Sequence, residues 1–271
     1  MKKFLLKLLV RIFNTTFSQR LLERNVNLSH YLMGIGAGSG VDSSGEKILI
    51  KKLRQRYAAN PSPMCVFDAG ANQGQFLKLL AGNLKDIPVT FHCFEPARHT
   101  FDILTERIGK TPNIILNNFG LGDHREEKDL YYDEIGSGKA SLSKRRLDHF
   151  GIDFILSEKV IINTLDDYCL DRKVENIDLL KLDVEGHELS VLKGGENTLR
   201  NGKVYMLTFE FGGCNIDSRT YFQDFWYLLQ EYGLRNFYRI TPSGLLVHLP
   251  EYDEIDEQFR TTNFLVCREP I

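Results

Sequence analysis

The sequence predicts an α/β fold in which strands of a mostly parallel sheet alternate with helices. One observation is local: the apolar run Cys65–Phe67 stops at Asp68, Gly70 and Gly74 bracket a turn, and helical periodicity begins at Gln75. The other is global, because further short apolar runs alternate with helical segments, at residues 89–94, 114–117, 160–162, 177–182 and 204–211. A strand, a glycine turn and a helix are how a doubly wound domain begins a nucleotide-binding site.

Composition is that of an ordinary globular protein, with 42% apolar and 26% charged residues. A net charge of −2 gives no electrostatic footprint for nucleic-acid binding. The five cysteines form no C-x-x-C pair, and three of them lie in apolar runs, so we expect a reducing, cytoplasmic location. No run approaches the ~18 apolar residues of a membrane span.

Residues 1–22 are basic, and Lys3, Lys7 and Arg11 recur every four residues, which places them in one stripe of a helix. The interrupted apolar stretch, with no small-residue cleavage site after it, argues against a secretory signal. Two interpretations stay open. The helix lies peripherally on an anionic inner-membrane surface or docks a partner, or its apolar side packs on its own domain.

A glycine-dense segment, residues 34–40, follows with no apolar strand before it, and we interpret it as a mobile loop that closes over the site. A helix then starts after Ser44 and continues to Tyr57. We therefore divide the chain into residues 1–45, a basic amphipathic helix with a glycine-rich loop, and a main domain at 46–271.

The turn after Asp68 has the spacing D-x-G-x-x-x-G, whereas dinucleotide binders have G-x-G-x-x-G. This difference favours S-adenosylmethionine (SAM), whose amino-acid end and ribose need close backbone but no pyrophosphate cradle. An ordinary strand-to-helix turn is the alternative. Glu95 ends the strand 89–94 about twenty residues beyond Gly74, where an acidic side chain accepts hydrogen bonds from ribose hydroxyls. The two marks together indicate a ribose site.

Asn118 and Phe119 follow the strand 114–117, where an amide and an aromatic ring can hold adenine, and an Asx turn between strands is the alternative. Residues 124–158 are polar and are expected to form a loop. Within this loop the basic run Lys144-Arg145-Arg146 either steers an anionic substrate or is simply solvated.

A second chemically rich turn follows the strand 177–182, where Asp183, Glu185, His187 and Glu188 crowd together before a helix that we expect to run towards Leu199. Carboxylates and an imidazole in this arrangement can hold a substrate hydroxyl and take its proton. Like charges this close repel one another unless a ligand or partner compensates. Glu210, near the carboxyl end of the strand 204–211, joins them.

These motifs together resemble the FkbM-type SAM-dependent methyltransferases over roughly residues 45–268. The resemblance rests on four segments: Phe67–Gly74, Phe94-Glu95-Pro96, Asn118–Gly122, and Leu182–Glu188 with Val191–Gly194. It implies a Rossmann-like class I fold with a seven-stranded sheet, a reversed C-terminal hairpin and helices on both faces. It also implies O-methylation, often of sugars in glycans or of related metabolites, and thus a role in polysaccharide modification.

The resemblance also implies roles for individual residues. The cofactor-binding residues would be Asp68, Gly70, Asn72 and Gly74 around the methionine moiety, Glu95 on the ribose, and Asn118 with Phe119 at the adenine. In catalysis, His187 or Asp183 would accept the hydroxyl proton while Glu185 and Glu210 orient the acceptor.

Three other functions compete with this interpretation. An NAD(P)-dependent oxidoreductase would share the fold, but the chain has neither the G-x-G-x-x-G spacing nor a Tyr-x-x-x-Lys pair. A metal-dependent O-methyltransferase would use Asp183 and Glu185 as ligands. A non-catalytic scaffold would bind SAM and reach a membrane surface through residues 1–22.

Overall fold

A computed structural model describes residues 2–271, without the side chains of Lys2 and Leu8. Its centre is a sheet of eight strands: β1 (Met64–Ala69), β2 (Val89–Phe94), β3 (Ile114–Asn117), β7 (Ile177–Leu182), β8 (Val204–Phe211), β9 (Asn236–Ile240), β10 (Leu246–Leu249) and β11 (Thr262–Cys267). Their order is β10-β9-β11-β8-β7-β1-β2-β3. The run from β3 to β8 is parallel, and β11 is antiparallel to both of its neighbours.

The fold class expected from the sequence is confirmed, including the reversed hairpin of β9 and β11. The sheet has one strand more than the seven that the resemblance implied. The extra strand is β10, which pairs antiparallel with β9 and forms one edge of the sheet.

Helices cover both faces of this sheet. One face carries α3 (Lys47–Ala59), α4 (Gln75–Asn83) and α5 (Arg98–Ile108), and the other carries α6 (Leu165–Asp171), α7 (Glu188–Lys193), α8 (Glu196–Arg200) and α10 (Phe222–Glu231). Short helices α9 (Cys214–Ser218), η1 (Asp148–Phe150) and η2 (Glu254–Asp256) lie in connections. Because strand side chains alternate between faces, Val66 and Leu179 join the α3–α4 core while Phe67 and Leu180 join the α10 core.

A second, three-stranded sheet is formed by β4 (Gly120–Gly122), β5 (Glu126–Tyr132) and β6 (Leu156–Thr164), in the order β4-β6-β5. The expectation of a continuous polar loop over residues 124–158 was therefore wrong. Six of the seven residues of β5 stay partly or fully exposed, and Leu130 alone is buried, so no apolar alternation marks the strand. Antiparallel pairing with β6 along its whole length forms it instead.

The single helix expected from His187 towards Leu199 is two helices, α7 and α8, with Gly194 and Gly195 between them. Gly194 lies so close to β4 that an added Cβ would stand 1.8 Å from the carbonyl oxygen of Gly122. The break lets the chain pack tightly against the second sheet.

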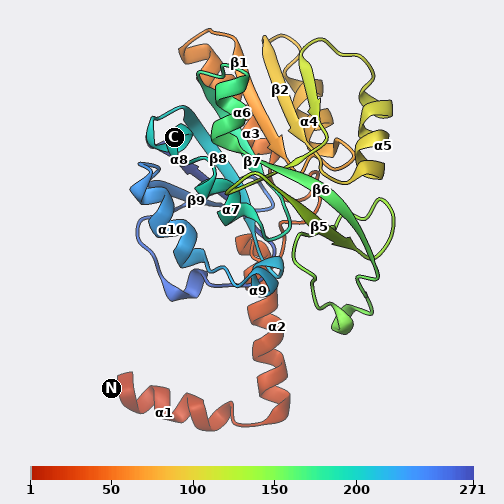
Figure 1. The fold of residues 1–271 in the computed structure, drawn as a ribbon. Helices are drawn as coiled ribbons and strands as arrows, with labels where there is room; N and C mark the ends of the chain where they lie inside the picture. Colours follow the sequence, from red (N-terminus) through yellow and green to blue (C-terminus); the bar gives the residue numbers. More distant parts are fainter. Residues whose placement is uncertain (1) are drawn as a thin grey trace.

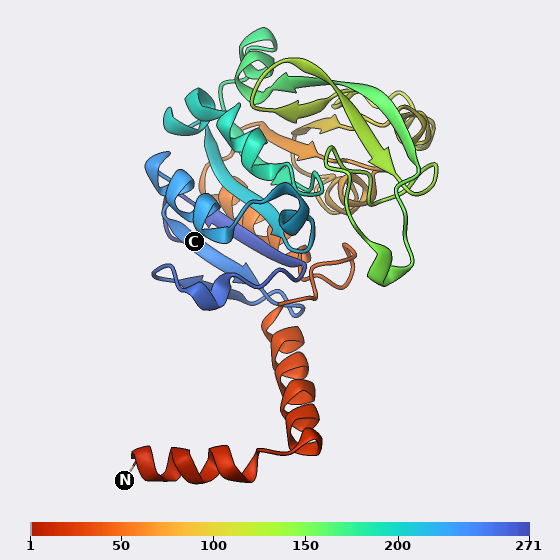
Figure 2. The same ribbon diagram turned by 60° about the horizontal axis from the view of Figure 1, so that its bottom comes forward.

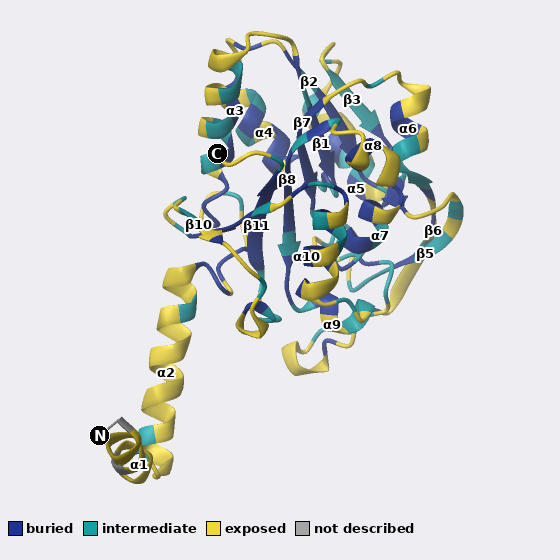
Figure 3. Cartoon of the chain, turned by 90° about the vertical axis from the view of Figure 1, so that its left-hand side faces the viewer, coloured by how far each residue is buried: buried dark blue, intermediate teal, exposed yellow. Residues whose placement is uncertain are grey.

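Two helices, α1 (Lys2–Ile12) and α2 (Thr16–Met33), replace the one helix expected at the N-terminus, and both stand away from the sheet (Figures 1 and 2). Thr15 separates them, and its hydroxyl accepts the backbone N–H of Ser18 at 3.1 Å to cap α2. No residue of α2 is buried (Figure 3), so this helix does not pack its apolar side on the domain. The following glycine-rich loop does pack, with Ile35 and Ala37 buried.

Candidate functional site

The strand order reverses direction at β1, which has β2 on one side and β7 on the other. In open α/β sheets ligands bind at such a switch point, outside the carboxyl ends of the strands. Asp68 is the last residue but one of β1 there, and Asp183 follows β7 and donates its backbone N–H to the carbonyl of Ala69 at 2.9 Å. The two turns that the sequence singled out therefore adjoin in space.

A first cleft opens between these turns. Its walls come from the turn after β1, the ends of β2 and β7, β4, and the loop 133–155. Gly70 is required at its floor. The residue has φ 83°, and an added Cβ would stand 1.8 Å from the carbonyl oxygen of Asp183.

Glu95 lies in the wall of this cleft and is almost completely buried, at 7% exposure. Its carboxylate accepts the backbone N–H of Asn72 at 3.0 Å and that of Ala97 at 2.9 Å. Burial raises the pKa of Glu95 to about 7, and these two hydrogen bonds counteract the rise. The carboxylate is thus held in place by backbone at the position expected for a ribose ligand.

Asp68 is 2% exposed, and neither of its carboxylate oxygens has a hydrogen-bond partner among the residues that the structure describes. Burial raises its pKa to about 6, whereas the ammonium of Lys181 lowers it. A buried carboxylate without donors is costly, so this group is a candidate to receive a hydrogen bond from a ligand.

Of the other residues assigned to the cofactor, some line the first cleft and others do not. Asn72 has φ 48° and lines the first cleft, and Gly74 caps α4 with φ 84°. Asn118 and Phe119 do not line the cleft. The amide of Asn118 donates to the carbonyls of Glu95 and Pro96, at 3.0 and 3.1 Å, and the ring of Phe119 packs on the core aromatics. Gly120 and Leu121 form the wall at this level, and the adenine assignment stays a prediction.

A second cleft lies on the α3–α4 side of the same sheet edge. It is lined by the carboxyl ends of β7 and β8, by β11 and by the glycine-rich loop with the residues after it: Gly38, Gly40, Val41, Glu46, Lys181, Leu182, Asp183, Thr208, Phe209, Glu210 and Asn263. The loop is fixed there, since the N–H of Gly38 donates to the carbonyl of Thr261 at 2.9 Å. Asp183 lines both clefts and therefore joins them.

Lys181 is the one ammonium among the residues lining the second cleft, and sequence reasoning gave it no role. Its Nζ donates to Asp183 at 2.8 Å and lies 3.9 Å from Asp68. Burial lowers the pKa of Lys181, but Asp183, Asp68 and Glu46 together raise it above its ordinary value, so the group stays charged. The sequence did contain a signal for this contact. Lys181 stands two residues before Asp183 at the end of a strand, and residues two apart in a strand point to the same face of the sheet.

Two carboxyl groups of the second cleft, those of Glu210 and Glu46, have a raised pKa. Burial, followed by Asp183 and Glu185, raises the pKa of Glu210 well above its usual range. Burial also raises the pKa of Glu46, while Lys181 and the hydroxyl of Ser44 lower it. The ammonium of Lys181 therefore lies among several carboxyl groups and lowers the pKa of both Glu210 and Glu46 against the effect of burial.

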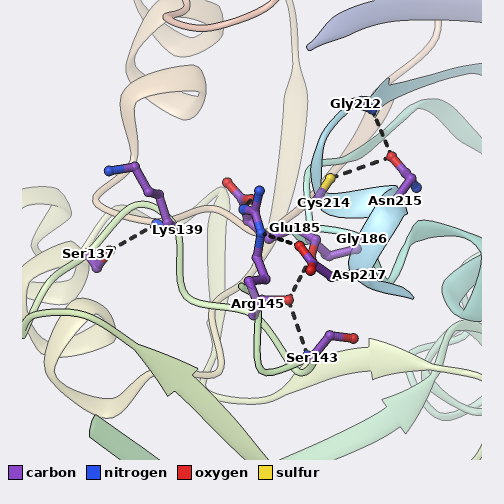
Figure 4. Close-up of polar contacts among 12 residues, drawn as sticks. Ser137, Lys139, Ser143, Arg145, Glu185, Gly186, Gly212, Cys214, Asn215 and Asp217 are labelled. Atoms are coloured by element: carbon purple, nitrogen blue, oxygen red, sulfur yellow. Dashed lines mark hydrogen bonds and ion pairs between the residues drawn. The ribbon is translucent and has the colours of Figure 1, made fainter. Parts of the chain in front are cut away.

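Glu185 is held by the loop 133–155 (Figure 4). Nη1 of Arg145 donates to its carboxylate at 2.6 Å, and Nε of the same guanidinium donates to Asp217 at 3.3 Å. Burial and then Asp183 raise the pKa of Glu185 to about 8, against the opposing charge of Arg145. Arg145 thus has a defined partner and is not a merely solvated residue of the basic run.

His187 lines neither cleft. Its Nε2 lies next to Gly122 of β4 and has no hydrogen-bond partner among the described residues. Burial lowers its pKa to about 4, so the ring is neutral at pH 7. Glu188 is fully buried and accepts the N–H groups of Val184 and Gly186, both at 3.1 Å, which shapes the turn. Of the four residues assigned to catalysis, Asp183, Glu185 and Glu210 line a cleft.

The first cleft fits the cofactor that the sequence indicated. It presents the carboxylate of Glu95 at its wall and a glycine where backbone must come close, whereas the buried Asp68, which has no hydrogen-bond partner among the described residues, lines neither cleft. A metal ion fits less well, because the carboxylate of Glu185 is engaged by Arg145. Among the described residues the one cluster with ligand spacing is Asp123, His124 and Glu126, which is outside both clefts.

Comparison with known proteins gives two curated relatives. The hexuronic acid methyltransferase AglP of Haloferax volcanii is 27% identical over 164 residues, which is 59% of this chain and 60% of that protein. The 2-O-methyltransferase NoeI of Sinorhizobium fredii is 29% identical over 153 residues, 51% of this chain and 60% of that protein. The chain thus spans about 60% of the length of these relatives.

Solved structures give weaker likenesses. The FkbM methyltransferase of Methylobacillus flagellatus has 18% identity and a TM-score of 0.45, over 75% of this chain and 43% of that one. The TehB-like SAM-dependent methyltransferase of Corynebacterium glutamicum has 15% identity and a TM-score of 0.40, over 94% and 97%.

The family comparison covers the site itself. The model described as the methyltransferase FkbM domain matches residues 68–235, well over half of the chain, from Asp68 of β1 to the residue before β9. This range includes every residue that the sequence assigned to the cofactor or to catalysis. The chain therefore belongs to the FkbM family of methyltransferases.

Proposed function

We propose that this protein is a SAM-dependent O-methyltransferase that methylates a hydroxyl group of a sugar, a glycan or a related metabolite. The observation that carries the proposal is the meeting of two clefts at Asp183. One cleft has the groups that a nucleoside needs, and the other has hydrogen-bonding carboxyl groups without a nucleoside site. A methyl donor and a hydroxyl acceptor can thus approach each other from opposite sides of one residue.

In this proposal SAM occupies the first cleft and supplies an activated methyl group. Glu95 binds its ribose hydroxyls, and Asp68 accepts a hydrogen bond at the amino-acid end, beside the close backbone turn at Gly70 and Asn72. The loop 133–155 covers the cleft, and its position depends on the pair of Arg145 with Glu185.

The acceptor occupies the second cleft. Asp183 is 38% exposed, whereas the Lys181 side chain that orients it is 7% exposed. The carboxylate of Asp183 accepts the proton of the acceptor hydroxyl, and the carboxyl groups of Glu210 and Glu46 hold neighbouring hydroxyls. A polyhydroxylated acceptor suits a cleft with several carboxyl groups and one engaged ammonium, since each carboxyl oxygen accepts hydrogen bonds. The printed names of the curated relatives, a hexuronic acid methyltransferase and a 2-O-methyltransferase, support a sugar hydroxyl.

The test uses the purified chain with SAM and a panel of oligosaccharides, some with hexuronic acid and some neutral, and mass spectrometry of the products. We expect one added methyl group on a hydroxyl oxygen, and the same yield in the presence of a chelator. Cell-envelope glycans from cells with and without the protein extend the search to unknown acceptors. Binding of SAM without a methylated product on any acceptor would favour the non-catalytic scaffold, and inhibition by the chelator would favour a metal-dependent enzyme.

A further inference from the structure

The N-terminal arm, residues 2–33, is the part of the protein that its own fold leaves uncovered. Helix α2 has 18 residues, about 27 Å of helix, and none of them is buried. The C-terminal part of α2 is fixed to the domain, because Nε of Arg239 donates to the carbonyl of Met33 at 3.0 Å and Nη2 of Arg260 donates to Asn27 at 2.8 Å. The arm is thus a defined projection with an anchored base, visible as the red helices of Figure 2.

Large apolar side chains of the arm face the solvent. The most exposed are Phe4 (77%), Leu6 (63%), Val10 (65%), Phe17 (79%), Leu28 (60%) and Leu32 (64%). Single exposed apolar residues are common, but a contiguous apolar surface on a monomer marks a place of contact with a membrane or a protein. We therefore expect a membrane or another protein to cover the apolar side chains of the arm.

The charge of the arm favours an anionic membrane surface as the structure that covers it. Residues 1–33 hold six of the 34 lysines and arginines of the chain, but only one, Glu23, of its 36 acidic residues. On α1 the exposed Lys3, Lys7 and Arg11 form one stripe, and apolar residues occupy much of the remaining circumference. This arrangement is that of a helix lying in a membrane interface, with the basic stripe towards anionic headgroups.

A second copy of the chain is the competing occupant. Pairing two arms would place two basic segments side by side with only Glu23 of each to offset their charge, which disfavours that contact. A spanning orientation is not supported either, since none of the helices that the structure describes is long and apolar enough to cross a bilayer. We propose that the N-terminal arm binds the surface of an anionic membrane, with α1 lying in the interface.

The arm leads directly into the site. Met33, its last residue, is followed by the glycine-rich loop whose Gly38 and Gly40 line the second cleft. Membrane binding would therefore hold the proposed acceptor cleft in a fixed relation to the lipid surface. This consequence depends on the proposed function, whereas the binding itself does not, and the two are tested by different measurements.

The experiment is co-flotation of the full-length chain with two kinds of vesicle. One is phosphatidylcholine alone, and the other is phosphatidylcholine with about 30% of the anionic lipid phosphatidylglycerol. We expect binding to the anionic vesicles that weakens steeply when salt is raised, because the Debye length falls. The variant Lys3→Gln/Lys7→Gln/Arg11→Gln should bind on the order of a hundredfold less tightly, because each basic residue near the surface contributes about 1 kcal/mol and about 1.4 kcal/mol is a tenfold change in affinity. The matched control Lys85→Gln/Arg107→Gln/Lys110→Gln removes three exposed basic groups elsewhere and should bind as the wild type does.

Thermal unfolding of each variant establishes that the domain is intact, since the arm contributes no buried residue from α2. Equal binding to neutral and anionic vesicles would overturn the proposal, as would equal loss in both triple variants. No vesicle binding, combined with a concentration-dependent dimer that Phe17→Ser/Leu28→Ser/Leu32→Ser abolishes, would assign the arm to a second copy of the chain instead.

Discussion

Asp68 on β1 and Lys181 on β7 are register partners across two neighbouring parallel strands, with 3.9 Å between Oδ1 and Nζ. Both side chains point to the α3–α4 side of the sheet, where the ammonium lies 5.1 Å from the ring centroid of Phe76. Since Nζ also donates to Asp183, one lysine connects the strand that ends at the first cleft with the residue that joins both clefts.

Replacing Lys181 with Met should destabilise the protein. The change leaves Asp68 and Asp183 without their shared cation, and removing one partner of a buried ion pair costs about 3–5 kcal/mol. Urea unfolding at pH 7.5 measures the loss. Lys51→Met, at an exposed position of α3, should change stability by less than about 0.5 kcal/mol. A stabilised Lys181→Met variant would mean that the surrounding carboxyl groups are already protonated.

Glu95→Gln should weaken SAM binding by at least about tenfold in calorimetry, because a hydrogen bond to a charged group contributes roughly 1.5–3 kcal/mol. The N–H groups of Asn72 and Ala97 donate to different oxygens of Glu95, so the one amide oxygen of Gln keeps one of these hydrogen bonds and loses the other. Asp68→Asn is expected to act in the same direction, and the exposed Glu106→Gln is the control. Unchanged affinity in both site variants contradicts the cofactor assignment.

The sequence predicted those parts of the site that depend on strand ends. Asp68, Glu95 and Asp183 each follow an apolar run, and the carboxyl ends of parallel strands meet at one edge, so their proximity follows from topology. The sequence could not predict that the amide of Asn118 donates to two backbone carbonyls, because these contacts depend on the path of the chain after β3.

The second sheet was missed for a different reason. The strand β5 begins Glu-Glu-Lys-Asp and buries one residue, so neither an apolar run nor alternation identifies it. Its formation depends on pairing with a segment about thirty residues away, which no local pattern encodes. The position of His187 followed from the same sheet, since β4 occupies the side to which the imidazole turns.

Asp183→Asn should reduce turnover by about 10²–10⁴-fold, the range of general-base catalysis, while SAM binding persists. His187→Ala should leave turnover close to that of the wild type, because the imidazole lines neither cleft. Single-turnover kinetics with saturating SAM, together with calorimetry on the same samples, separates the two effects. The reverse pattern, a slow His187→Ala and an active Asp183→Asn, would assign the proton acceptor to the histidine.

Arg145→Met and Arg146→Met form a matched pair of adjacent substitutions. The side chain of Arg145 is 10% exposed and bonds Glu185 and Asp217, whereas that of Arg146 is 88% exposed and pairs with Asp148 at the surface. Only the first should release the loop 133–155, which limited proteolysis detects, and lower the unfolding free energy by about 3 kcal/mol. Equal proteolysis of both variants would show that the loop is held by other contacts.

The pH dependence of stability follows from the buried carboxyl groups. Burial raises the pKa of Glu95 and Glu188 to about 7 and that of Glu185 to about 8, so the folded state keeps protons that the unfolded chain releases from about pH 4.5 upward. The stability that each group contributes is complete below its unfolded pKa and is lost as pH rises through the folded value. His92 and His187 act oppositely, but only between about pH 4 and 6.5.

Between pH 6.5 and 8 the carboxyl groups therefore act alone, and the ligand-free protein should lose stability as pH rises, by at most about 1.4 kcal/mol per pH unit for each group. Urea unfolding at half-unit steps measures this slope. Glu188→Gln should flatten it, because the amide oxygen can still accept the N–H groups of Val184 and Gly186 but carries no titrating proton. A slope that is equally steep in this variant would remove Glu188 from the groups that control the effect, and a rising slope would mean that these carboxylates are ionised and stabilised in the fold.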